Sequence, residues 1–328
     1  LFHPPAAGTA SLAAGWNDLG EIRELGAGIT PGICVDGAGT IHVVYMHDGA
    51  ISYRRAGTDG LFDQAEAVPL PDGQANYNSP HFVCDSGGTV HLVFERDVTR
   101  ASKKAWYVNR QAGGWSAPVL AIDHSGTPRR VNYPRLAVAD TNAYVAGFTG
   151  GGSTLVKLEN IRAAPRVAAR IDTLLWVAHP LVTKTGELLV VGRDGAGGHK
   201  LERYSSDLAP RGEPLLLSRG TLAKTLEPTA AIIDETGVVH AAGVTQSPVH
   251  EIWYATSARA AAGKEVVLGP EVGVETGEFT YPVLLRDARR RIYVSYRDHT
   301  SGESRLTMLD PDGSRFAAPI VIAAAITR

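Results

Sequence analysis

The sequence lacks the features that mark several specialised classes of protein. Its 328 residues carry a formal net charge of −2 at pH 7, so no basic excess points to a nucleic-acid partner. No apolar run approaches the ~20 residues that a membrane-spanning helix needs. No spacing typical of metal ligands is visible either. We therefore expect no nucleic-acid partner, no membrane partner and no metal or other cofactor.

What the sequence does contain is a repeat. A unit of 46 to 54 residues recurs, and each copy opens near a proline. Segments 36–45, 85–94, 234–240 and 287–296 align with one another, and 140–148 and 185–192 are weaker copies. The opening prolines are Pro31, Pro80, Pro134, Pro180, Pro228 and Pro282. Six units of this length indicate a repeat architecture.

Each unit contains four short runs that are rich in β-branched and aromatic residues and separated by Gly and Asp turns, which predicts four strands. In the first unit they fall at 30–36, 40–46, 50–56 and 63–70. Only 256–264 could form a short helix. The sequence therefore predicts an all-β fold, a β-propeller of six four-stranded blades, with seven blades as the alternative number.

The two ends of the chain both resemble the last strand of a unit. Residues 16–25 and 316–323 are the two candidates, and one of them would be an extra edge strand. The chain begins at Leu1 rather than Met, and residues 1–15 are rich in Ala, Pro and Gly. We interpret 1–15 as a tether and 16–328 as a single propeller domain, expected to be monomeric. A processed start would be consistent with a secreted or periplasmic protein, although a cloning choice explains it equally well.

Only two cysteines are present, Cys34 and Cys84, in the first strands of neighbouring units. In the repeat alignment Cys34 matches Val83, whereas Cys84 matches Val35. Successive side chains of a strand point to opposite faces, so we expect the thiols to point apart and to remain unpaired. Unpaired, they would say little about the compartment.

In a propeller, the residues around each opening proline and those that end each second strand share one face. This face gathers arginines, tyrosines and histidines that differ from unit to unit, which favours one site over six identical ones. Arginine suits a carboxylate or sulfate, and Tyr and His are common proton carriers. The candidate catalytic residues are His81, Tyr133, His179 and Tyr281, and the candidate substrate-binding residues are Glu95, Arg96, Arg135, Arg193, Glu227 and Arg297.

Other polar residues recur at fixed repeat positions and are interpreted as structural. His42, His91 and His240 share one position, which indicates packing or hydrogen bonding between blades. The aspartates at 36, 85, 234 and 287 are typical of turns.

Two blades resemble a known motif. Tyr281-Pro282 followed by Arg297-Asp298, and His179-Pro180 followed by Arg193-Asp194-Gly195, resemble the blades of bacterial-neuraminidase-repeat-like propellers. That superfamily includes sialidases and ulvan lyase-like enzymes. The lyase branch implies that Tyr281 transfers the proton and Arg297 neutralises the carboxylate. His179 and Arg193 align with these two residues in the fourth blade, and His81 is the candidate for an assisting histidine.

The resemblance, together with the arginines, predicts a carbohydrate-active enzyme on an acidic, uronate-containing glycan, a polysaccharide lyase that acts by β-elimination. A sialidase-like or rhamnosidase-like glycoside hydrolase is the alternative, with Arg135, Arg193, Arg297, Tyr281 and Glu227 in its site. The Asp-box motif of sialidases is missing, and its nearest remnant, 57–62, lacks the Trp. A non-catalytic propeller that binds a glycan or a protein is the second alternative.

Overall fold

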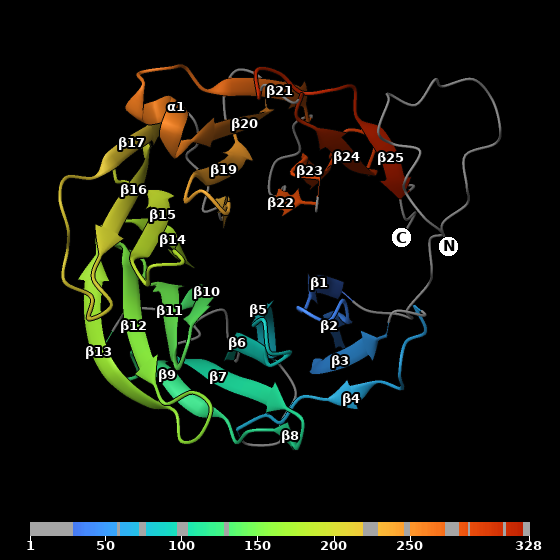
Figure 1. Ribbon diagram of the computed structural model, residues 1–328, viewed down its shortest axis with the longest axis vertical. Helices are drawn as coiled ribbons and strands as arrows, with labels where there is room; N and C mark the ends of the chain where they lie inside the picture. Colours follow the sequence, from blue (N-terminus) through green and yellow to red (C-terminus); the bar gives the residue numbers. More distant parts are fainter. Residues whose placement is uncertain are drawn as a thin grey trace. The chain divides into compact units, whose positions relative to one another are not determined.

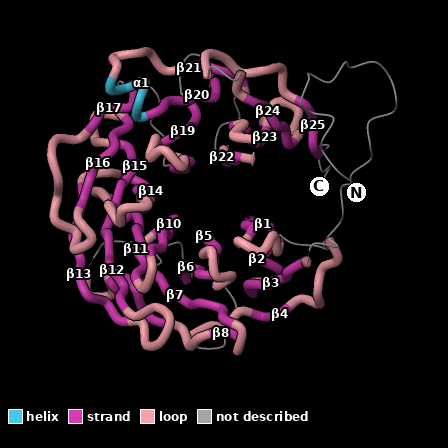
Figure 2. Tube along the Cα trace, viewed as in Figure 1, coloured by secondary structure: helices cyan, strands magenta, loops and turns pink. Residues whose placement is uncertain are grey.

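The computed structural model describes residues 29–57, 60–71, 77–96, 104–127, 131–218, 229–245, 250–272, 282–287, 289–310 and 313–323. Antiparallel β-sheet dominates these residues, which confirms the all-β prediction (Figures 1 and 2). Six successive sheets form the blades of a six-bladed β-propeller, one for each repeat. No helix in the described part of the chain has the length and apolar character that crossing a membrane would require.

The chain forms two compact units. The N-terminal unit comes from Gly26–Gly195 and Leu201–Pro214, and the described part of the C-terminal unit comes from Ala196–Lys200 and from Leu215 onward. The first sheet contains β1 (Ile29–Val35), β2 (Ile41–His47), β3 (Ala50–Ala56) and β4 (Glu66–Ala67). The second contains β5 (Tyr77–Cys84), β6 (Val90–Arg96), β7 (Lys104–Gln111), β8 (Gly114–Trp115) and β9 (Val119–Asp123), with β7 paired to both β8 and β9.

The remaining sheets follow the same strand order. The third contains β10 (Asn132–Ala139), β11 (Asn142–Phe148), β12 (Ser153–Glu159) and β13 (Arg166–Thr173). The fourth contains β14 (Trp176–Val182), β15 (Leu188–Arg193), β16 (His199–Tyr204) and β17 (Leu215–Ser218). The fifth contains β18 (Ala230–Ile233), β19 (Val239–Val244), β20 (Glu251–Thr256) and β21 (Val267–Glu271). The sixth contains β22 (Val283–Arg286), β23 (Ile292–Arg297), β24 (Ser304–Met308) and β25 (Ile320–Ala323).

The expected helix is present but short, because α1 covers only Ser257–Ala261. Thr256 caps it by accepting a hydrogen bond from the Arg259 amide. At the C-terminus, β25 pairs with β24 and completes the sixth sheet. The competing segment 16–25 and the tether 1–15 lie outside the described residues.

The second and third sheets of the N-terminal unit bury both of their faces against neighbouring sheets. Leu92 belongs to the apolar cluster shared by the first and second sheets, whereas the next residue, Val93, belongs to the cluster shared by the second and third. Side chains alternate along a strand, so the forward face of one blade packs on the rear face of the next. Figure 1 shows the first strands β1, β5, β10 and β14 gathered along one side of this unit.

This packing explains why the cysteine prediction is wrong. Cys34 and Cys84 form a disulfide, with their Cα atoms 6.0 Å apart. The alignment itself holds, since Cys34 pairs with His42 and Cys84 pairs with Val90. However, the forward face of one blade packs against the rear face of the next. Two side chains that point to opposite faces of their own blades can therefore meet between the blades, as Cys34 and Cys84 do.

The first strands of four sheets share one irregularity. Between two consecutive paired positions, the first strand advances by three residues while the second strand advances by two. The extra residue in the first strand forms a β-bulge. The shifts lie between Ile29 and Gly32, Asn78 and His81, Asn132 and Arg135, and Trp176 and His179. We name this end of the first strands the bulge end, and the opposite end, where Asp36 and Asp85 open the hairpins to the second strands, the turn end.

Candidate functional site

At the turn end one hydrogen-bonded arrangement is repeated. His91 Nδ1 lies 2.7 Å from the Tyr107 hydroxyl, and His91 Nε2 lies 3.4 Å from Asp85 Oδ2. Because the carboxylate only accepts, His91 Nε2 donates to it and Nδ1 accepts from Tyr107. The same arrangement joins Asp36, His42 and Tyr53, and also Asp234, His240 and Tyr254.

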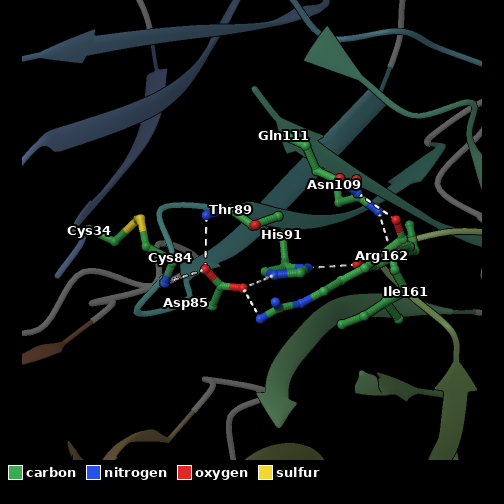
Figure 3. Close-up of polar contacts among 11 residues, drawn as sticks. Cys34, Cys84, Asp85, Thr89, His91, Asn109, Gln111, Ile161 and Arg162 are labelled. Carbon is green, nitrogen blue, oxygen red and sulfur yellow. Dashed lines mark hydrogen bonds and ion pairs between the residues drawn. A yellow bond between two sulfur atoms is a disulfide. The ribbon is translucent and has the colours of Figure 1, made fainter. Parts of the chain in front are cut away.

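The turn role predicted for the aspartates is confirmed. Asp85 Oδ1 accepts hydrogen bonds from the Gly87 and Thr89 amides, both at 2.9 Å. Its Oδ2 also forms an ion pair at 3.0 Å with Arg162, which lies in the turn between β12 and β13 of the third blade (Figure 3). His91 and Tyr107 are fully buried. This network joins two blades and presents no reactive group to a substrate, so its histidine is structural.

At the bulge end, three candidate residues occupy one register position. His81, Arg135 and His179 each follow the bulge directly and pair with Val93, Ala146 and Val191. In the first sheet this position is Gly32, where an added Cβ would lie 2.5 Å from the ring of Phe82. The second, third and fourth sheets therefore supply the polar side chains.

This register corrects the proline-based alignment, in which His179 before Pro180 matches Tyr133 before Pro134. Counted from the bulge, His179 matches Arg135, and Tyr133 matches Val177. Tyr133 and Val177 have φ angles of 51° and 48°, a left-handed conformation that is uncommon for such residues. Pro134 lies within its bulge whereas Pro180 comes after its bulge, so the proline pattern alone misplaces the residue by two positions.

His81 and His179 meet edge to face. Their ring centroids are 5.4 Å apart and the ring planes are at 88°. The Leu136 amide lies 3.2 Å from His81 Nδ1. A backbone N–H can only donate, so Nδ1 is unprotonated and neutral His81 carries its proton on Nε2.

Electrostatics keep His81 neutral. Burial lowers the pKa of His81 well below its usual value, and Coulombic repulsion from Arg135, and from His179 when it is protonated, lowers it further. Arg135 is partly buried, and its guanidinium donates to the Pro134 carbonyl at 3.3 Å. The cluster therefore combines a permanent cation with a neutral imidazole that donates from Nε2, and Tyr133 lies two residues from Arg135 in the bulge.

Glu95 and Arg193 share the register position before the bulge, where they pair with Asn78 and Trp176. Glu95 is buried, with 4% of its surface exposed. The Arg193 guanidinium lies 5.4 Å from the centroid of the Trp176 ring. Burial lowers the pKa of Arg193, and Asp194 opposes that shift. Sequence reasoning missed Trp176. It holds the same position before the bulge in β14 as Asn78 holds in β5, and an alignment by strand register would have identified it.

For the other candidates the structure gives only their place in the chain or in a strand. Arg297 ends β23 in the C-terminal unit and is exposed. Arg96 ends β6, where its backbone pairs with Tyr77. Tyr281 and Glu227 lie outside the described residues. The structure thus brings together His81, Arg135 and His179, with Tyr133 beside Arg135 and with Glu95 and Arg193 one step along the strands.

Comparison with known proteins shows the fold but not a family, because no family model and no curated protein matches the sequence. A lectin from Burkholderia pseudomallei is similar in structure, with a TM-score of 0.63, 13% identity, and coverage of 89% of this chain and 84% of the lectin. An ulvan lyase of a new polysaccharide lyase family, bound to -[GlcA(1-4)Rha3S]-, is similar with a TM-score of 0.57, 12% identity, and coverage of 88% and 81%. A protein of unknown function from Dyadobacter fermentans gives a TM-score of 0.56, 11% identity, and coverage of 89% and 94%. The resemblance to the neuraminidase-repeat superfamily stays a prediction.

Proposed function

We propose that the protein acts on an acidic, uronate-containing glycan as a polysaccharide lyase. The observation that carries this proposal is the edge-to-face pair of His81 and His179, with Arg135 at the same register position. The shared fold with a glycan-bound ulvan lyase and a lectin supports a carbohydrate ligand.

In this mechanism Arg135 binds the uronate carboxylate through its guanidinium fork, and the Nε2 proton of His81 donates to the same group. Neutralising the carboxylate makes the C5 proton more acidic. His179 accepts that proton, the C5–H electron pair forms the C4–C5 double bond, and the C4–O bond breaks. A tyrosine protonates the leaving oxygen; Tyr281 is implied by the resemblance, and Tyr133 stands beside Arg135.

The test mixes the full chain with a panel of uronate-containing polysaccharides and follows ultraviolet absorbance. β-Elimination creates a conjugated double bond that absorbs there, whereas hydrolysis does not. We expect a rise with the wild-type protein that is lost in His179→Ala and Arg135→Ala. His47→Ala, which changes a half-exposed histidine of the first sheet, is the matched control.

Two other outcomes have defined meanings. New reducing ends without absorbance would favour the sialidase-like or rhamnosidase-like hydrolase, which needs an acid and a nucleophile; Glu95 is a candidate carboxyl for it at the bulge end. Binding without either product would favour a non-catalytic glycan-binding propeller.

The disulfide adds a proposal about location. A bond between Cys34 and Cys84 forms and persists in oxidising compartments. We therefore propose that the protein is secreted or periplasmic. Mass spectrometry of the protein from its native cell, after alkylation without reduction, tests this; two alkylated cysteines would contradict it.

A further inference from the structure

One tyrosine at the bulge end holds a strained backbone. Tyr133 has a φ angle of 51°, in the left-handed region that L-residues rarely adopt because the Cβ atom approaches the backbone there. Pro134 follows it, and a residue before a proline normally takes an extended conformation instead. Glycine is the residue that adopts a left-handed conformation in a bulge without strain. The chain therefore holds a tyrosine at a position whose backbone favours glycine.

Other residues with a positive φ have explanations that do not apply to Tyr133. The non-glycine residues of this kind in the described part of the chain are Asp48, Tyr133, Asp140, Asn160, Val177, Leu208 and Arg290. Asp and Asn tolerate the conformation. Val177 and Leu208 are only 3% and 2% exposed, so burial of their side chains offsets the strain. Arg290 forms an ion pair with Glu235. Tyr133 is only partly buried, and no described residue forms a hydrogen bond, an ion pair or a ring contact with its side chain.

The segment that carries Tyr133 contacts the histidine pair. The Arg135 guanidinium donates to the Pro134 carbonyl at 3.3 Å, so the cation lies against the residue that follows Tyr133. The Leu136 amide donates to His81 Nδ1 at 3.2 Å. Three residues of extended chain span at most about 11 Å, which bounds the distance between the Cα atoms of Tyr133 and Leu136. A ligand held by Arg135 and His81 therefore lies close to Tyr133.

We propose that Tyr133 is the catalytic residue that protonates the leaving oxygen, in the role that the resemblance gives to Tyr281. The inference rests on the proposed function and assigns one of its steps. A hydroxyl has one proton to donate, and that of Tyr133 is not engaged by any described residue. Residues held in sparsely populated conformations cluster at active sites, where the strain fixes a side chain before the substrate binds.

The protons and electrons of this step balance within the site. His179 takes the C5 proton, and the electron pair of the C5–H bond forms the C4–C5 double bond. The C4–O bond breaks with its electron pair on the oxygen, and the Tyr133 hydroxyl gives that oxygen its proton. The proton on His179 then returns to the Tyr133 phenolate through solvent, so that both residues are restored for the next turnover.

The test compares two leaving groups with the full-length protein. The first substrate is a polysaccharide of the panel that the wild type cleaves, in which the leaving group is a sugar oxygen that must gain a proton. The second is a methyl uronoside whose C4 oxygen carries a 4-nitrophenyl group, which departs as the coloured phenolate without one. Tyr133→Phe keeps the ring and removes the proton. Tyr45→Phe, at a partly buried tyrosine of β2, is the matched control.

We expect Tyr133→Phe to lower kcat on the polysaccharide about a hundredfold and to leave the release of 4-nitrophenolate within about twofold of wild type. Its unfolding midpoint should not change, because no described residue bonds the hydroxyl. Tyr45→Phe should change neither rate. Unaltered cleavage of the polysaccharide by Tyr133→Phe, or an equal loss on both substrates, would overturn the assignment. The same difference between substrates in Tyr281→Phe instead would also overturn it.

A second pair of variants tests the strain. Tyr133→Gly and Tyr133→Ala both remove the ring, but only glycine accommodates the left-handed backbone, so Tyr133→Gly should unfold at the higher temperature. At Tyr45, in the extended strand β2, the order should be the reverse, because glycine weakens a strand. If Tyr133→Ala is the more stable variant, the strain is absent and the proposal falls.

Failure of this inference differs from failure of the proposed function. Elimination by the wild type together with full activity of Tyr133→Phe overturns only the role of Tyr133. The absence of elimination from either substrate by the wild type overturns the lyase and this inference with it.

Discussion

The two ends of the same first strands do different work. At the turn end, three sheets repeat one Asp–His–Tyr network with the same partners and nearly the same distances. At the bulge end, the position after the bulge holds His81, Arg135 and His179 in consecutive sheets. A structural interaction uses the same residues in each blade where it occurs. A single functional site is asymmetric, so the residues that neighbouring blades contribute to it can differ.

Histidine shows the contrast most directly. His91 is held at both nitrogens inside its own blade, by Asp85 and Tyr107. His81 Nδ1 accepts from a backbone amide of the next blade, which puts the proton of neutral His81 on Nε2 as a donor. The same side chain is thus a packing element at one end and a candidate donor at the other. Changes at the turn end should therefore affect stability, and changes at the bulge end should affect activity.

Removing the disulfide should have the largest effect. Cys34 and Cys84 lie near the turn end of β1 and β5 and are 50 residues apart in sequence. The chain-entropy model predicts that Cys34→Ala/Cys84→Ala lowers the free energy of unfolding by about 4 kcal/mol. Urea unfolding with and without a reductant measures it. Reduced wild-type protein should match the double variant, and a wild-type stability that reduction leaves unaltered would contradict the prediction.

Arg135 should produce the opposite result. Arg135→Ala removes the cation that binds the carboxylate and should lower kcat/KM about a hundredfold, or about 3 kcal/mol of transition-state stabilisation. Arg135→Lys keeps the charge but loses the fork, so its activity should fall between the two. The unfolding midpoint should stay near that of wild type, because Arg135 is only partly buried.

The control is Arg166→Lys, an exposed arginine on β13 that pairs with Glu159 at 3.4 Å. It should change neither activity nor stability. If Arg135→Ala destabilised the protein as much as the disulfide variant does, Arg135 would belong with the structural residues, and the comparison between the two ends would fail.

The repeat predicted the fold because blades are specified locally. Short runs of alternating apolar and polar residues, Asp turns and a spacing of 46 to 54 residues recur in each sequence repeat. Each repeat forms its own sheet. A structural role for His42, His91 and His240 followed from the same logic, but the predicted hydrogen bonding between blades is wrong, because each histidine bonds an Asp and a Tyr of its own blade. Recurrence at one position indicates a partner that also recurs, and that partner is the blade's own Tyr.

The site was only partly predictable because it depends on how blades face one another. The alternation of side chains along a strand placed Cys34 and Cys84 on opposite faces of their own blades, which is correct. It does not show that these two faces pack against each other between neighbouring blades. Proline alignment matched His179 with Tyr133, because Pro134 lies within its bulge whereas Pro180 follows the bulge, a difference that only the second-strand register reveals. His81, Arg135 and His179 were chosen one by one, but their shared position could not be deduced from the spacing of prolines.

A smaller loss of stability should follow at the turn end when one hydroxyl is removed. Tyr107→Phe leaves the buried Nδ1 of His91 without its donor, which should cost about 2 kcal/mol in unfolding free energy. Activity per folded molecule should not change. Tyr45→Phe, a partly buried tyrosine of β2, is the control in the same assay. A loss of activity that exceeds the loss of folded protein would contradict a purely structural role.

The smallest effect should come from pH, and it acts on both ends. Burial lowers the pKa of His81, His91 and His240. Between the lowered pKa and the unfolded value of about 6.5, the unfolded chain binds more protons than the folded one. The free energy of unfolding should therefore decrease as pH falls from about 7 to about 5, by on the order of 1 kcal/mol. A stability that stayed constant or rose over this range would contradict the buried, neutral histidines.

Nuclear magnetic resonance of the histidine side chains resolves which end responds first. At the turn end, Asp85 and Asp234 counteract burial, whereas Arg135 and His179 add to it at His81. His81 should therefore protonate last and should show the Nε2–H tautomer throughout. A bound uronate would place a negative charge beside Arg135 and raise the pKa of His81, while that of His91 would not move. Equal responses of both histidines to the glycan would mean that the ligand does not bind at the bulge end.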